Sequence, residues 1–427
     1  MSAIKNVVIG MSGKMDSFVA AYLLKKQGLN VIGVCVQMVD PNDPLFARPR
    51  VSSVRDAYGD ENRANDLSYI PQFLPQCHIA DMEKARAQAE HLDIPFYAVN
   101  ALSEFKSIVL DRVLSAGILG EKLFPCMFCH QLLISILEKK ADILKAEMVA
   151  TGHYAHVHIL KSKKVYVVAS SNDLTIDQSL KLSQLTQSQL SRLILPLAEM
   201  RRDEVVKIAQ SMSRDVQISQ PETSCFMSSP YLPEFIERTT PPSLRKPGNV
   251  LRYEDDLLVR DHVGIHTFML GEKPPELRTD QIAAPGDESF IVVQKGFTNG
   301  AVFVANEKNL SFKSFVLTQV ILNPLMDMTK TRDAVAHLAL HKDRWPCVIH
   351  FKNNQMLLVE LKTEMAGHMS QGAAVGIYDS AEKGARLIAV GIVTGVPILN
   401  SVFFKRQNDK DVAHVTACLE RNKKLGF

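Results

Sequence analysis

A buried strand that runs directly into a polar, glycine-containing turn and then into a helix is the feature that most limits the fold of this chain. Residues Asn6 to Gly10 (NVVIG) predict the strand, and Asp16 to Lys26 predict the helix, which ends at Gly28. Further strands are expected at Asn30 to Met38, Ile94 to Val99 and Glu147 to Ala150. Helices are expected at Ala80 to Leu92, Ser103 to Ala116, Cys129 to about Leu144, and Asp203 to Met212. This alternation predicts an α/β fold with a parallel sheet and helices on both faces.

The rest of the chain has a different pattern. Residues 40–76 are polar with several prolines and predict a long loop or insertion. Short strand-like runs at Ser289 to Val293 and Ala301 to Ala305 precede a region of strands only, which predicts a small β-barrel. The barrel strands are expected at Phe312 to Leu317, Cys347 to Phe351, Met356 to Leu361, Ala374 to Tyr378 and Ala389 to Val393. We therefore expect three domains, at residues 1–212, 213–309 and 310–427.

Composition sets the class of protein and leaves its partners open. The 427 residues are 46% hydrophobic and 22% charged, which is typical of a globular chain of several domains. The formal net charge of +3 neither demands nor excludes a nucleic acid, because a basic patch can lie within a balanced total. No signal peptide or membrane-spanning run is recognisable, so we expect a cytoplasmic protein with no membrane partner. An odd count of seven cysteines argues against a disulfide scaffold.

The turn Ser12-Gly13-Lys14-Met15-Asp16-Ser17 carries the residues expected of a phosphate site. Gly13 lets the backbone bend close to an anion, and the amides that open the next helix favour negative charge. Ser12 and Ser17 supply hydroxyl groups and Lys14 a positive charge, whereas a caging or metal-holding role suits Asp16 better. Parallel sheets bind ligands at the carboxyl ends of their strands, where this turn and Thr151-Gly152-His153 both lie. The pattern is not the G-x-x-x-x-G-K-[ST] loop of kinases and GTPases.

The segment Gly10 to Ser17 resembles the pyrophosphatase (PP) loop, S-G-G-x-D-S, of enzymes that adenylylate a substrate with ATP and release pyrophosphate. Lys14 replaces the second glycine of that loop, a change that either tightens or obstructs the contact with pyrophosphate. The resemblance implies ATP and Mg²⁺ as cofactors, and Met38 at the end of the second strand is where the family places a backbone contact to adenine. The implied nucleotide-binding residues are Gly10, Met11, Ser12, Gly13, Lys14, Met15, Asp16, Ser17, Met38 and Gly152.

Four further segments, in the same order along the chain, resemble one branch of that superfamily, the tRNA-specific 2-thiouridylases. They span roughly the first 230 residues and are joined by a weaker match at Ser370-Gln371-Gly372. The segments are Phe124 to His130 (FPCMFCH, for N-P-[DC]-x-x-C-N), Ala150 to Ala155 (ATGHYA), Ile176 to Ser179 (IDQS, for K-D-Q-S) and Pro221 to Phe226 (PETSCF, for P-[DE]-S-Q-x-I-C-F).

The resemblance implies an ATP-dependent tRNA sulfurtransferase that replaces the 2-oxygen of a uridine, by default the wobble uridine, with sulfur. ATP adenylylates the oxygen so that it departs with AMP, and sulfur arrives on a cysteine persulfide. The implied catalytic residues are Cys129 as nucleophile and Cys225 as carrier of the persulfide, together with Cys126 and Asp16. A thiol near a helix N-terminus or a cation is the reactive kind, because the thiolate is then favoured.

Cys126 leaves the sulfur mechanism open. Many family members have aspartate at this position, so the chain carries a third thiol beside Cys129 and Cys225. Three cysteines can also hold a [4Fe-4S] cluster with one open iron, and the sequence alone does not separate this mechanism from the persulfide route. A simpler alternative is that Cys126 and Cys129 are core residues one helical turn apart.

The same resemblance names residues that contact tRNA, namely His153, Asp177, Gln178 and Gln371. Ile176 replaces the family's lysine and removes one phosphate contact. Other candidates for phosphate contact are Lys161, Lys163, Lys164, Arg201 and Arg202, with solvated surface charge as the alternative for each. The implied partners are tRNA and a sulfur-donor protein such as a cysteine desulfurase or relay protein, and the expected state is a monomer or transient dimer.

Several departures from the family pattern indicate a divergent member. His130 stands for asparagine, and Glu272 stands for glutamine in the segment that follows His262-Val263-Gly264. Two alternatives therefore stay open: an adenylylating enzyme that acts on another RNA or a small molecule, and a catalytically silent ATP- or tRNA-binding paralogue. The expected barrel argues against a small-molecule substrate, because a small substrate needs no RNA clamp. The joint presence of Asp16, Cys129 and Cys225 argues against the second.

Overall fold

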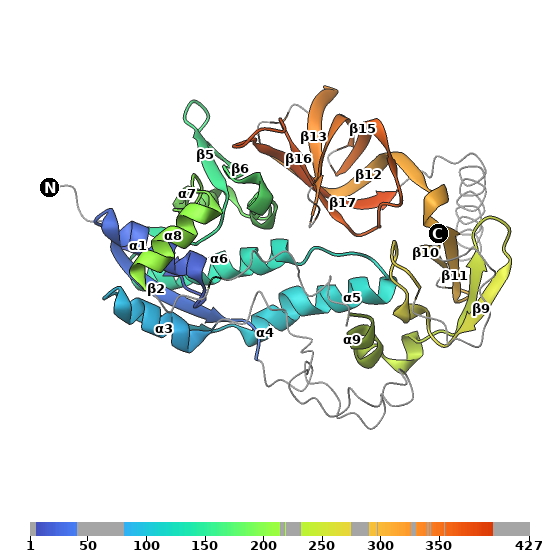
Figure 1. Cartoon of the computed structure of the whole chain (residues 1–427), viewed down its shortest axis with the longest axis horizontal. Helices are drawn as coiled ribbons and strands as arrows, with labels where there is room; N and C mark the ends of the chain where they lie inside the picture. The colour runs from blue at the N-terminus through green and yellow to red at the C-terminus, as the bar shows by residue number, and fades with distance from the viewer. Residues whose placement is uncertain are drawn as a thin grey trace, which may run out of the picture. The chain divides into compact units, whose positions relative to one another are not determined.

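A computed structural model describes residues 6–40, 81–213, 218, 232–274, 290–296, 298–324, 326, 330–339, 341, 343–353 and 355–395. The chain divides into two compact units (Figure 1). Unit 1 contains Met1–Val113, Phe124–Phe235 and Glu382–Leu387, and unit 2 contains Leu114–Leu123, Ile236–Ala381 and Ile388–Phe427. Each unit thus includes a short segment from within the sequence of the other. The division into three domains at 212 and 309 stays a prediction.

The expected parallel sheet forms the centre of unit 1. Its five strands run in the order β3-β2-β1-β4-β7, and every neighbouring pair is parallel. The strands are β1 (Asn6–Gly10), β2 (Asn30–Gln37), β3 (Phe96–Asn100), β4 (Met148–Ala150) and β7 (Leu193–Ile194). Because β1 pairs with β2 on one side and with β4 on the other, the chain order reverses at β1. Ligands of open parallel sheets bind at this kind of switch point.

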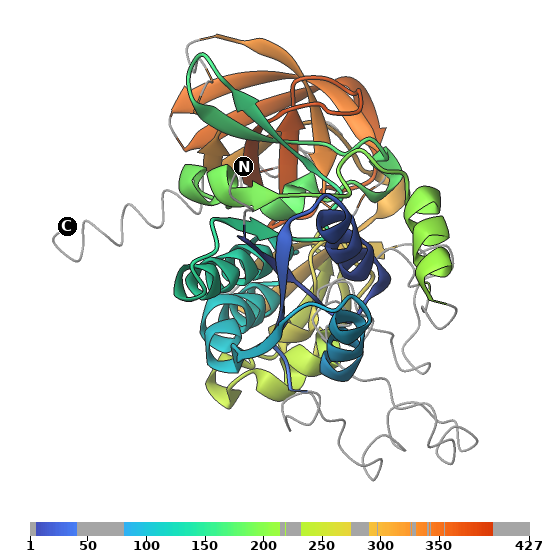
Figure 2. The same ribbon diagram turned by 90° about the vertical axis from the view of Figure 1, so that its left-hand side faces the viewer.

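Helices cover both faces of the sheet, because successive side chains of β1 are apolar and point to opposite faces. Val7 and Ile9 point into a core shared with α1 (Met15–Lys26), α3 (Met82–His91) and α8 (Arg202–Met212). Gly10 faces the other way, and a Cβ there would lie 3.1 Å from Leu137 of α6 (Cys126–Ile143). In Figure 2, α1 and α6 lie on opposite sides of the blue strand β1.

Two helix boundaries differ from the expectation. The helix predicted at 103–116 is α4 (Leu102–Phe105), a π-helical turn (Lys106–Leu110) and α5 (Asp111–Leu119). α6 begins at Cys126 and not at Cys129, so that prediction was wrong by one turn. The reason is that the carbonyl of Pro125 accepts the amide of Cys129 (3.0 Å), which closes a first helical turn around Cys126. The predicted insertion lies outside the described residues from position 41 onwards.

Unit 1 also contains a hairpin that the sequence analysis did not predict. β5 (His156–Leu160) pairs with β6 (Val165–Ala169) in antiparallel fashion and extends away from the sheet (Figure 1). Ala169 also forms an isolated bridge with Arg386. After the hairpin come α7 (Gln187–Arg192), which starts with a capping box between Thr186 and Gln189, and then β7.

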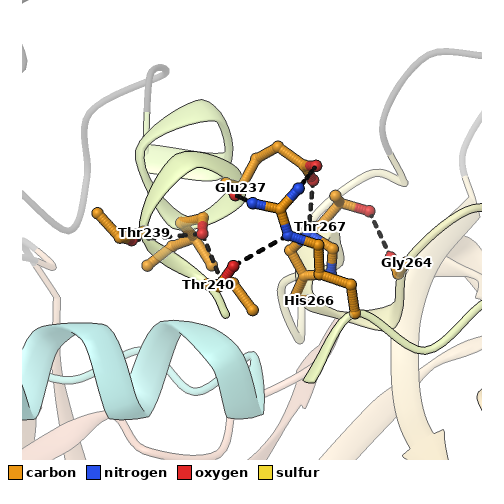
Figure 3. Close-up of polar contacts among 8 residues, drawn as sticks. Glu237, Thr239, Thr240, Gly264, His266 and Thr267 are labelled. Carbon is orange, nitrogen blue, oxygen red and sulfur yellow. Dashed lines mark hydrogen bonds and ion pairs between the residues drawn. The ribbon is translucent and has the colours of Figure 1, made fainter. Parts of the chain in front are cut away.

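Unit 2 contains a four-stranded sheet in the order β10-β11-β8-β9. Its strands are β8 (Gly248–Arg252), β9 (Leu258–His262), β10 (Phe290–Gly296) and β11 (Ala301–Asn306). A polar cluster ties the end of α9 (Leu232–Thr239) to the turn that follows β9. There, Nε2 of the buried His266 lies 2.5 Å from Oε2 of Glu237, and Arg245 donates to the carbonyls of Glu237 and Thr240 (Figure 3).

The expected β-barrel is confirmed as a closed sheet in the order β12-β15-β14-β13-β16-β17. Its strands are β12 (Ser311–Leu322), β13 (Arg332–Leu338), β14 (Arg344–Asn353), β15 (Met356–Ala366), β16 (Ala374–Tyr378) and β17 (Leu387–Gly395). Alternate residues such as Leu357, Val359 and Leu361 fill the interior. β13 was missed because its buried residues are mainly alanines, which are depleted in strands and give a weak signal.

Candidate functional site: the carboxyl ends of β1 and β4

The turn after β1, residues 11–17, is called the cradle below. Its backbone reverses at Gly13, where φ is +79° and a Cβ would lie 2.5 Å from the carbonyl oxygen of Asp81. Only glycine fits such a left-handed, crowded position without strain. The side chains of Ser12 and Ser17 lie 3.2 Å apart (Oγ to Oγ), and Ser17 donates to the carbonyl of Lys14 at 3.0 Å. The cradle is therefore a tight turn held by its own hydroxyl groups.

α1 presents its N-terminus to this turn. Among the described residues, no side chain forms a capping hydrogen bond to the start of α1, where Lys14 occupies the cap position in an extended conformation. The helix has 12 residues, so its aligned dipoles favour an anion at this end. Met11 and Met15 are buried at 2% and 1% exposure and serve as packing residues. The backbone and hydroxyls of the cradle are thus arranged as expected of a phosphate-binding turn.

Asp16 is held by two side chains that the sequence analysis did not connect with it. Its Oδ1 accepts a hydrogen bond from the hydroxyl of Tyr154 (2.7 Å) and another from Nη1 of Arg202 (3.2 Å). Burial raises the pKa of Tyr154 well above its usual range, and the nearby Asp16 carboxylate adds to this effect. The carboxylate therefore fastens the first turn of α1 to the segment after β4 and to α8. Its metal-holding role stays a prediction.

Gly152 brings the segment after β4 into contact with the cradle. A Cβ at this position would lie 2.8 Å from the carbonyl oxygen of Asp16 and 2.9 Å from the amide nitrogen of Ser17. Neither backbone atom can give way without moving the first turn of α1. A glycine is therefore needed where the two strand ends meet, and a direct contact of Gly152 with nucleotide stays a prediction.

A chain of hydrogen bonds connects β4 with the start of α6. Oγ1 of Thr151 lies 2.7 Å from Nδ1 of His153, whose Nε2 lies 2.8 Å from Nδ1 of His130. His153 is 7% exposed, and burial lowers its pKa to about 3, assisted by the positive charge of Lys181. His153 is thus neutral near pH 7 and orients His130. The histidine at position 130, a departure from the family pattern, has a structural partner here.

The two described cysteines of the predicted site lie in the first turn of α6. Cys126 and Cys129 are 4% and 2% exposed, and their i, i+3 spacing places them on one side of the helix. Cys225 lies outside the described residues, so the predicted meeting of the three thiols stays a prediction. Within the described part of the chain, no group of three His, Cys, Asp or Glu residues could hold a metal ion. The described thiols alone therefore do not complete a cluster site.

The predicted tRNA contacts of unit 1 have intramolecular partners. Asp177 accepts hydrogen bonds from the amides of Ser171 (3.0 Å) and Ser179 (3.2 Å). Gln178 makes two hydrogen bonds with Tyr154. Its side-chain Oε1 accepts the backbone amide of Tyr154 (3.1 Å), and its backbone amide donates to the carbonyl of Tyr154 (2.8 Å). Gln178 thus supports the segment that carries His153 and Tyr154, and Asp177 connects Ser171, which follows β6, with the turn at Ser179. Contact of these residues with tRNA stays a prediction.

The remaining predicted residues lie apart from this arrangement. Met38 is 3% exposed and follows the end of β2, and its contact with adenine is untested. Gln371 belongs to unit 2, where its carbonyl accepts the amide of Lys122 at 2.9 Å. Of the candidate phosphate contacts, Arg202 pairs with Asp16, and Arg201 pairs with Asp203 at 3.2 Å. Lys161, Lys163 and Lys164 are exposed at the tip of the β5–β6 hairpin.

A cavity of about 480 Å³ lies elsewhere in unit 1, between the end of β3, α4 and the outer side of α6. Its lining includes Asn100, Glu104, Gln131 and Lys140. None of the predicted site residues lines this cavity, so the cavity is separate from the predicted site at the cradle. In the described residues, no helix has both the length and the apolar character needed to cross a membrane.

Comparisons with known proteins identify the family of the chain. The family model described as "tRNA methyl transferase HUP domain" matches residues 5–229. A tRNA-specific 2-thiouridylase MnmA of Clostridium beijerinckii is 31% identical over 378 residues, which cover 88% of this chain and 96% of the relative. The protein of the same name from Clostridium acetobutylicum is 28% identical over 391 residues, covering 91% of this chain and 99% of the relative. That of Clostridium perfringens strain 13 is 33% identical over 271 residues, covering 63% and 68%.

Proposed function

This chain belongs to the tRNA-specific 2-thiouridylase family, and from that premise we propose that it is an ATP-dependent tRNA-uridine 2-sulfurtransferase. The single observation that carries the proposal is the junction of the cradle with Gly152. It sets an anion-binding turn directly beside a segment that connects, through His153 and His130, to the turn of Cys126 and Cys129. The relatives cover almost the whole chain, so the barrel is included in the likeness.

The cradle supplies the ATP step. The phosphates of ATP bind against the amides that open α1 and the hydroxyls of Ser12 and Ser17, and Lys14 adds positive charge. The uridine 2-oxygen attacks the α-phosphate, pyrophosphate leaves, and the proton from uridine N3 passes to solvent. Asp16 is proposed to hold α1 in register through Tyr154 and Arg202. Mg²⁺ would neutralise charge on the phosphates.

The cysteines supply the sulfur step. The terminal sulfur of a persulfide on Cys225 attacks C2 of the adenylylated uridine, and the oxygen leaves with AMP. The Cys129 thiolate then attacks the Cys225 sulfur, which releases the thiocarbonyl and leaves a Cys129–Cys225 disulfide. The sulfane sulfur is reduced and the two cysteines are oxidised, so an external thiol must reset the enzyme after each turnover. A [4Fe-4S] cluster held by Cys126, Cys129 and Cys225 is the competing route, and iron analysis of anaerobically purified protein decides between them.

We further propose that the β5–β6 hairpin contacts RNA phosphates. Its tip carries Lys161, Lys163 and Lys164, all exposed, and its first strand begins two residues after Tyr154. Neutralising these lysines with glutamine should lower the slope of log affinity against log salt by up to about 2 to 3, because each phosphate contact contributes roughly 0.7 to 0.9. A sulfur-donor protein, a cytoplasmic location and a monomeric or transiently dimeric state complete the proposal.

The test is a reaction that contains the protein, ATP, a persulfide donor, a reducing thiol and unmodified tRNA. The two readouts are the amount of pyrophosphate released and the modified nucleosides of the tRNA, which are identified by mass spectrometry. We expect pyrophosphate only with tRNA, together with 2-thiouridine at one position. Cys129→Ser should keep pyrophosphate release and lose more than 99% (~100-fold) of thiolation. Cys347→Ala, a buried barrel cysteine, is the matched control and should keep both.

Three results would count against the assignment. Pyrophosphate release with a small thiol acceptor and no RNA favours a small-molecule enzyme. Absence of pyrophosphate under every condition favours a silent binding protein. Undiminished thiolation by Cys129→Ser removes the proposed role of that cysteine.

A further inference from the structure

A mostly buried lysine of unit 1 has no role in the reaction described above. Lys181 is 9% exposed and belongs to a 3-10 turn (Ser179–Leu182) in which every residue is buried. Its neighbours Leu180 and Leu182 are apolar and only 5% and 0% exposed. Taking an ammonium group out of water is unfavourable unless an anion or a hydrogen-bond acceptor replaces the lost hydration. The position of Lys181 therefore requires a partner for its charge.

The described part of the chain does not provide that partner. Among the described residues, no oxygen accepts a hydrogen bond from Nζ of Lys181 and no carboxylate forms an ion pair with it. The acidic residue nearest in the sequence, Asp177, uses its carboxylate elsewhere. Its Oδ1 accepts the amides of Ser171 and Ser179, and its Oδ2 accepts the hydroxyl of Ser179 at 2.8 Å. The ammonium of Lys181 is therefore left for an anion from outside these residues.

The charge of Lys181 acts on the candidate site. Together with burial, it lowers the pKa of His153, which is neutral near pH 7 and so is not the missing anion. His153 follows Gly152, where a Cβ would lie 2.8 Å from the carbonyl oxygen of Asp16 in the first turn of α1. The lysine thus adds positive charge to the segment that adjoins the cradle, at the end of the sheet where parallel sheets bind ligands.

The segment that carries Lys181 differs from the family pattern in where its cation lies. Ile176, which stands for the family's lysine, packs against the apolar core of unit 1. Lys181 lies five residues further along the chain and brings an ammonium group close enough to act on His153. The segment therefore has a cation, but not at the position of the family's lysine.

We propose that Lys181 binds a phosphate group of the RNA backbone and so supplies, at a new position, the contact that Ile176 cannot make. The phosphates of ATP are the other source of such an anion, but the cradle already offers them the N-terminus of α1, two hydroxyls and Lys14. A cation in a mostly buried place attracts a phosphate more strongly than one in open water, because water screens it less. This inference rests on the proposed function for RNA as the substrate.

The test measures equilibrium binding of the full-length protein to unmodified tRNA over a range of salt concentrations. Lys181→Met keeps the length of the side chain and removes its charge. We expect the slope of log affinity against log salt to become shallower by roughly 0.7 to 0.9, which corresponds to about five- to eightfold weaker binding at about 0.1 M salt. Lys181→Arg keeps the charge and should keep the slope. The KM for ATP should stay unchanged in both variants.

A second readout separates a binding role from a structural one. Because an unpaired and mostly buried charge opposes folding, Lys181→Met should unfold at the same urea concentration as the unaltered protein or at a higher one. A lysine that stabilised the fold through an internal partner would give the opposite shift. Lys26→Met, at an exposed residue in the last turn of α1, is the matched control and should change neither the salt slope nor the urea midpoint.

An unchanged salt slope in Lys181→Met overturns the proposal, and so does an equal change of slope in Lys26→Met. A raised KM for ATP with an unchanged slope also overturns it, because the lysine then serves the nucleotide and not the RNA. A lower urea midpoint in Lys181→Met shows an internal partner and has the same consequence. If the unaltered protein binds tRNA but makes no 2-thiouridine, the proposed function fails, and the comparison of slopes still decides the role of Lys181.

Discussion

The turn after β1 and the segment after β4 lie side by side at one edge of the sheet, yet they are built differently. The cradle leaves the N-terminus of α1 without a side-chain cap among the described residues, and Ser12 and Lys14 are partly exposed. The segment after β4 buries Thr151, His153 and Tyr154, and each of these side chains is hydrogen-bonded within the protein. One strand end therefore leaves polar groups partly exposed, and at the other the polar side chains are buried and paired within the protein.

This difference teaches that a match to a family motif does not by itself indicate contact with the substrate. His153, Asp177 and Gln178 lie in motifs that imply tRNA contact, but their side chains bond to neighbouring parts of unit 1. Preorganised sites need such support, because a ligand group displaced by about 1 Å can cost roughly 100-fold in rate. The variants below test whether the two strand ends differ in the way proposed.

The largest effect is expected for Gly152→Ala. The new methyl group would meet the backbone of Asp16 and Ser17, so the first turn of α1 must shift. We expect tRNA-dependent pyrophosphate release to fall about 100-fold and the free energy of unfolding to fall by about 1–3 kcal/mol. Gly28→Ala, at the other end of α1 with no atom within 4 Å of the new methyl, should lose stability through its φ of +81° but keep the rate. Equal rates for the two variants would remove the supporting role of the β4 segment.

A smaller loss is expected for Arg202→Met, which takes one of two partners from Asp16. The side chains of Arg202 and Asp16 are 15% and 24% exposed, so their ion pair is mostly shielded from water. We expect the free energy of unfolding to fall by about 1–3 kcal/mol and pyrophosphate release to slow about tenfold. Arg201→Met is the matched control, because its exposed pair with Asp203 lies on the solvent side. The control should stay within about 0.5 kcal/mol. Chemical denaturation measures the free energy of unfolding, and the pyrophosphate assay measures the rate. If Arg202→Met has normal values of both, its ion pair with Asp16 does not support the cradle.

The buried side chain of His153 should make the stability of the protein depend on pH. Its pKa is about 3 in the folded protein and near 6.5 when unfolded, so the unfolded state binds an extra proton between these values. Stability from this residue is full above pH 6.5 and is lost as the pH falls towards 3, with a slope of at most about 1.4 kcal/mol per pH unit. His153→Gln should flatten the curve measured by urea denaturation in that window, whereas His91→Gln, at an exposed residue, should not. An unchanged slope in His153→Gln would show that the side chain is not buried as described.

The smallest effect is expected for Lys14→Gly, which restores the family's glycine in the cradle. If Lys14 contributes charge to phosphate binding, the KM for ATP should rise about two- to fivefold, as expected of a single exposed charge at a helix N-terminus. Lys26→Ala, in the last turn of α1, is the control and should leave the KM unchanged. A lower KM in Lys14→Gly would mean that the lysine obstructs the cradle.

Local patterns in the sequence were sufficient to predict a parallel sheet, a barrel and the cradle, although strands β7 and β13 were missed. Asn6 to Gly10 is a strand with the predicted bounds, and the helix predicted from Asp16 begins at Met15. These elements follow from hydrophobic periodicity and turn residues within a few positions of one another. The start of α6 was less accurate, because the carbonyl of Pro125 closes an earlier helical turn, and the π-helical turn within the α4–α5 segment was not predicted.

The sequence by itself determined which residue types surround the nucleotide turn and which thiols are candidates for sulfur transfer. Only the tertiary structure decided that Asp16 pairs with Tyr154 and Arg202, that His130 meets His153, and that Glu272 is matched by Lys122. These partners are 23 to 186 positions apart in the chain. Pairing at such separations depends on how strands and helices pack, and no local periodicity in a single sequence carries that information.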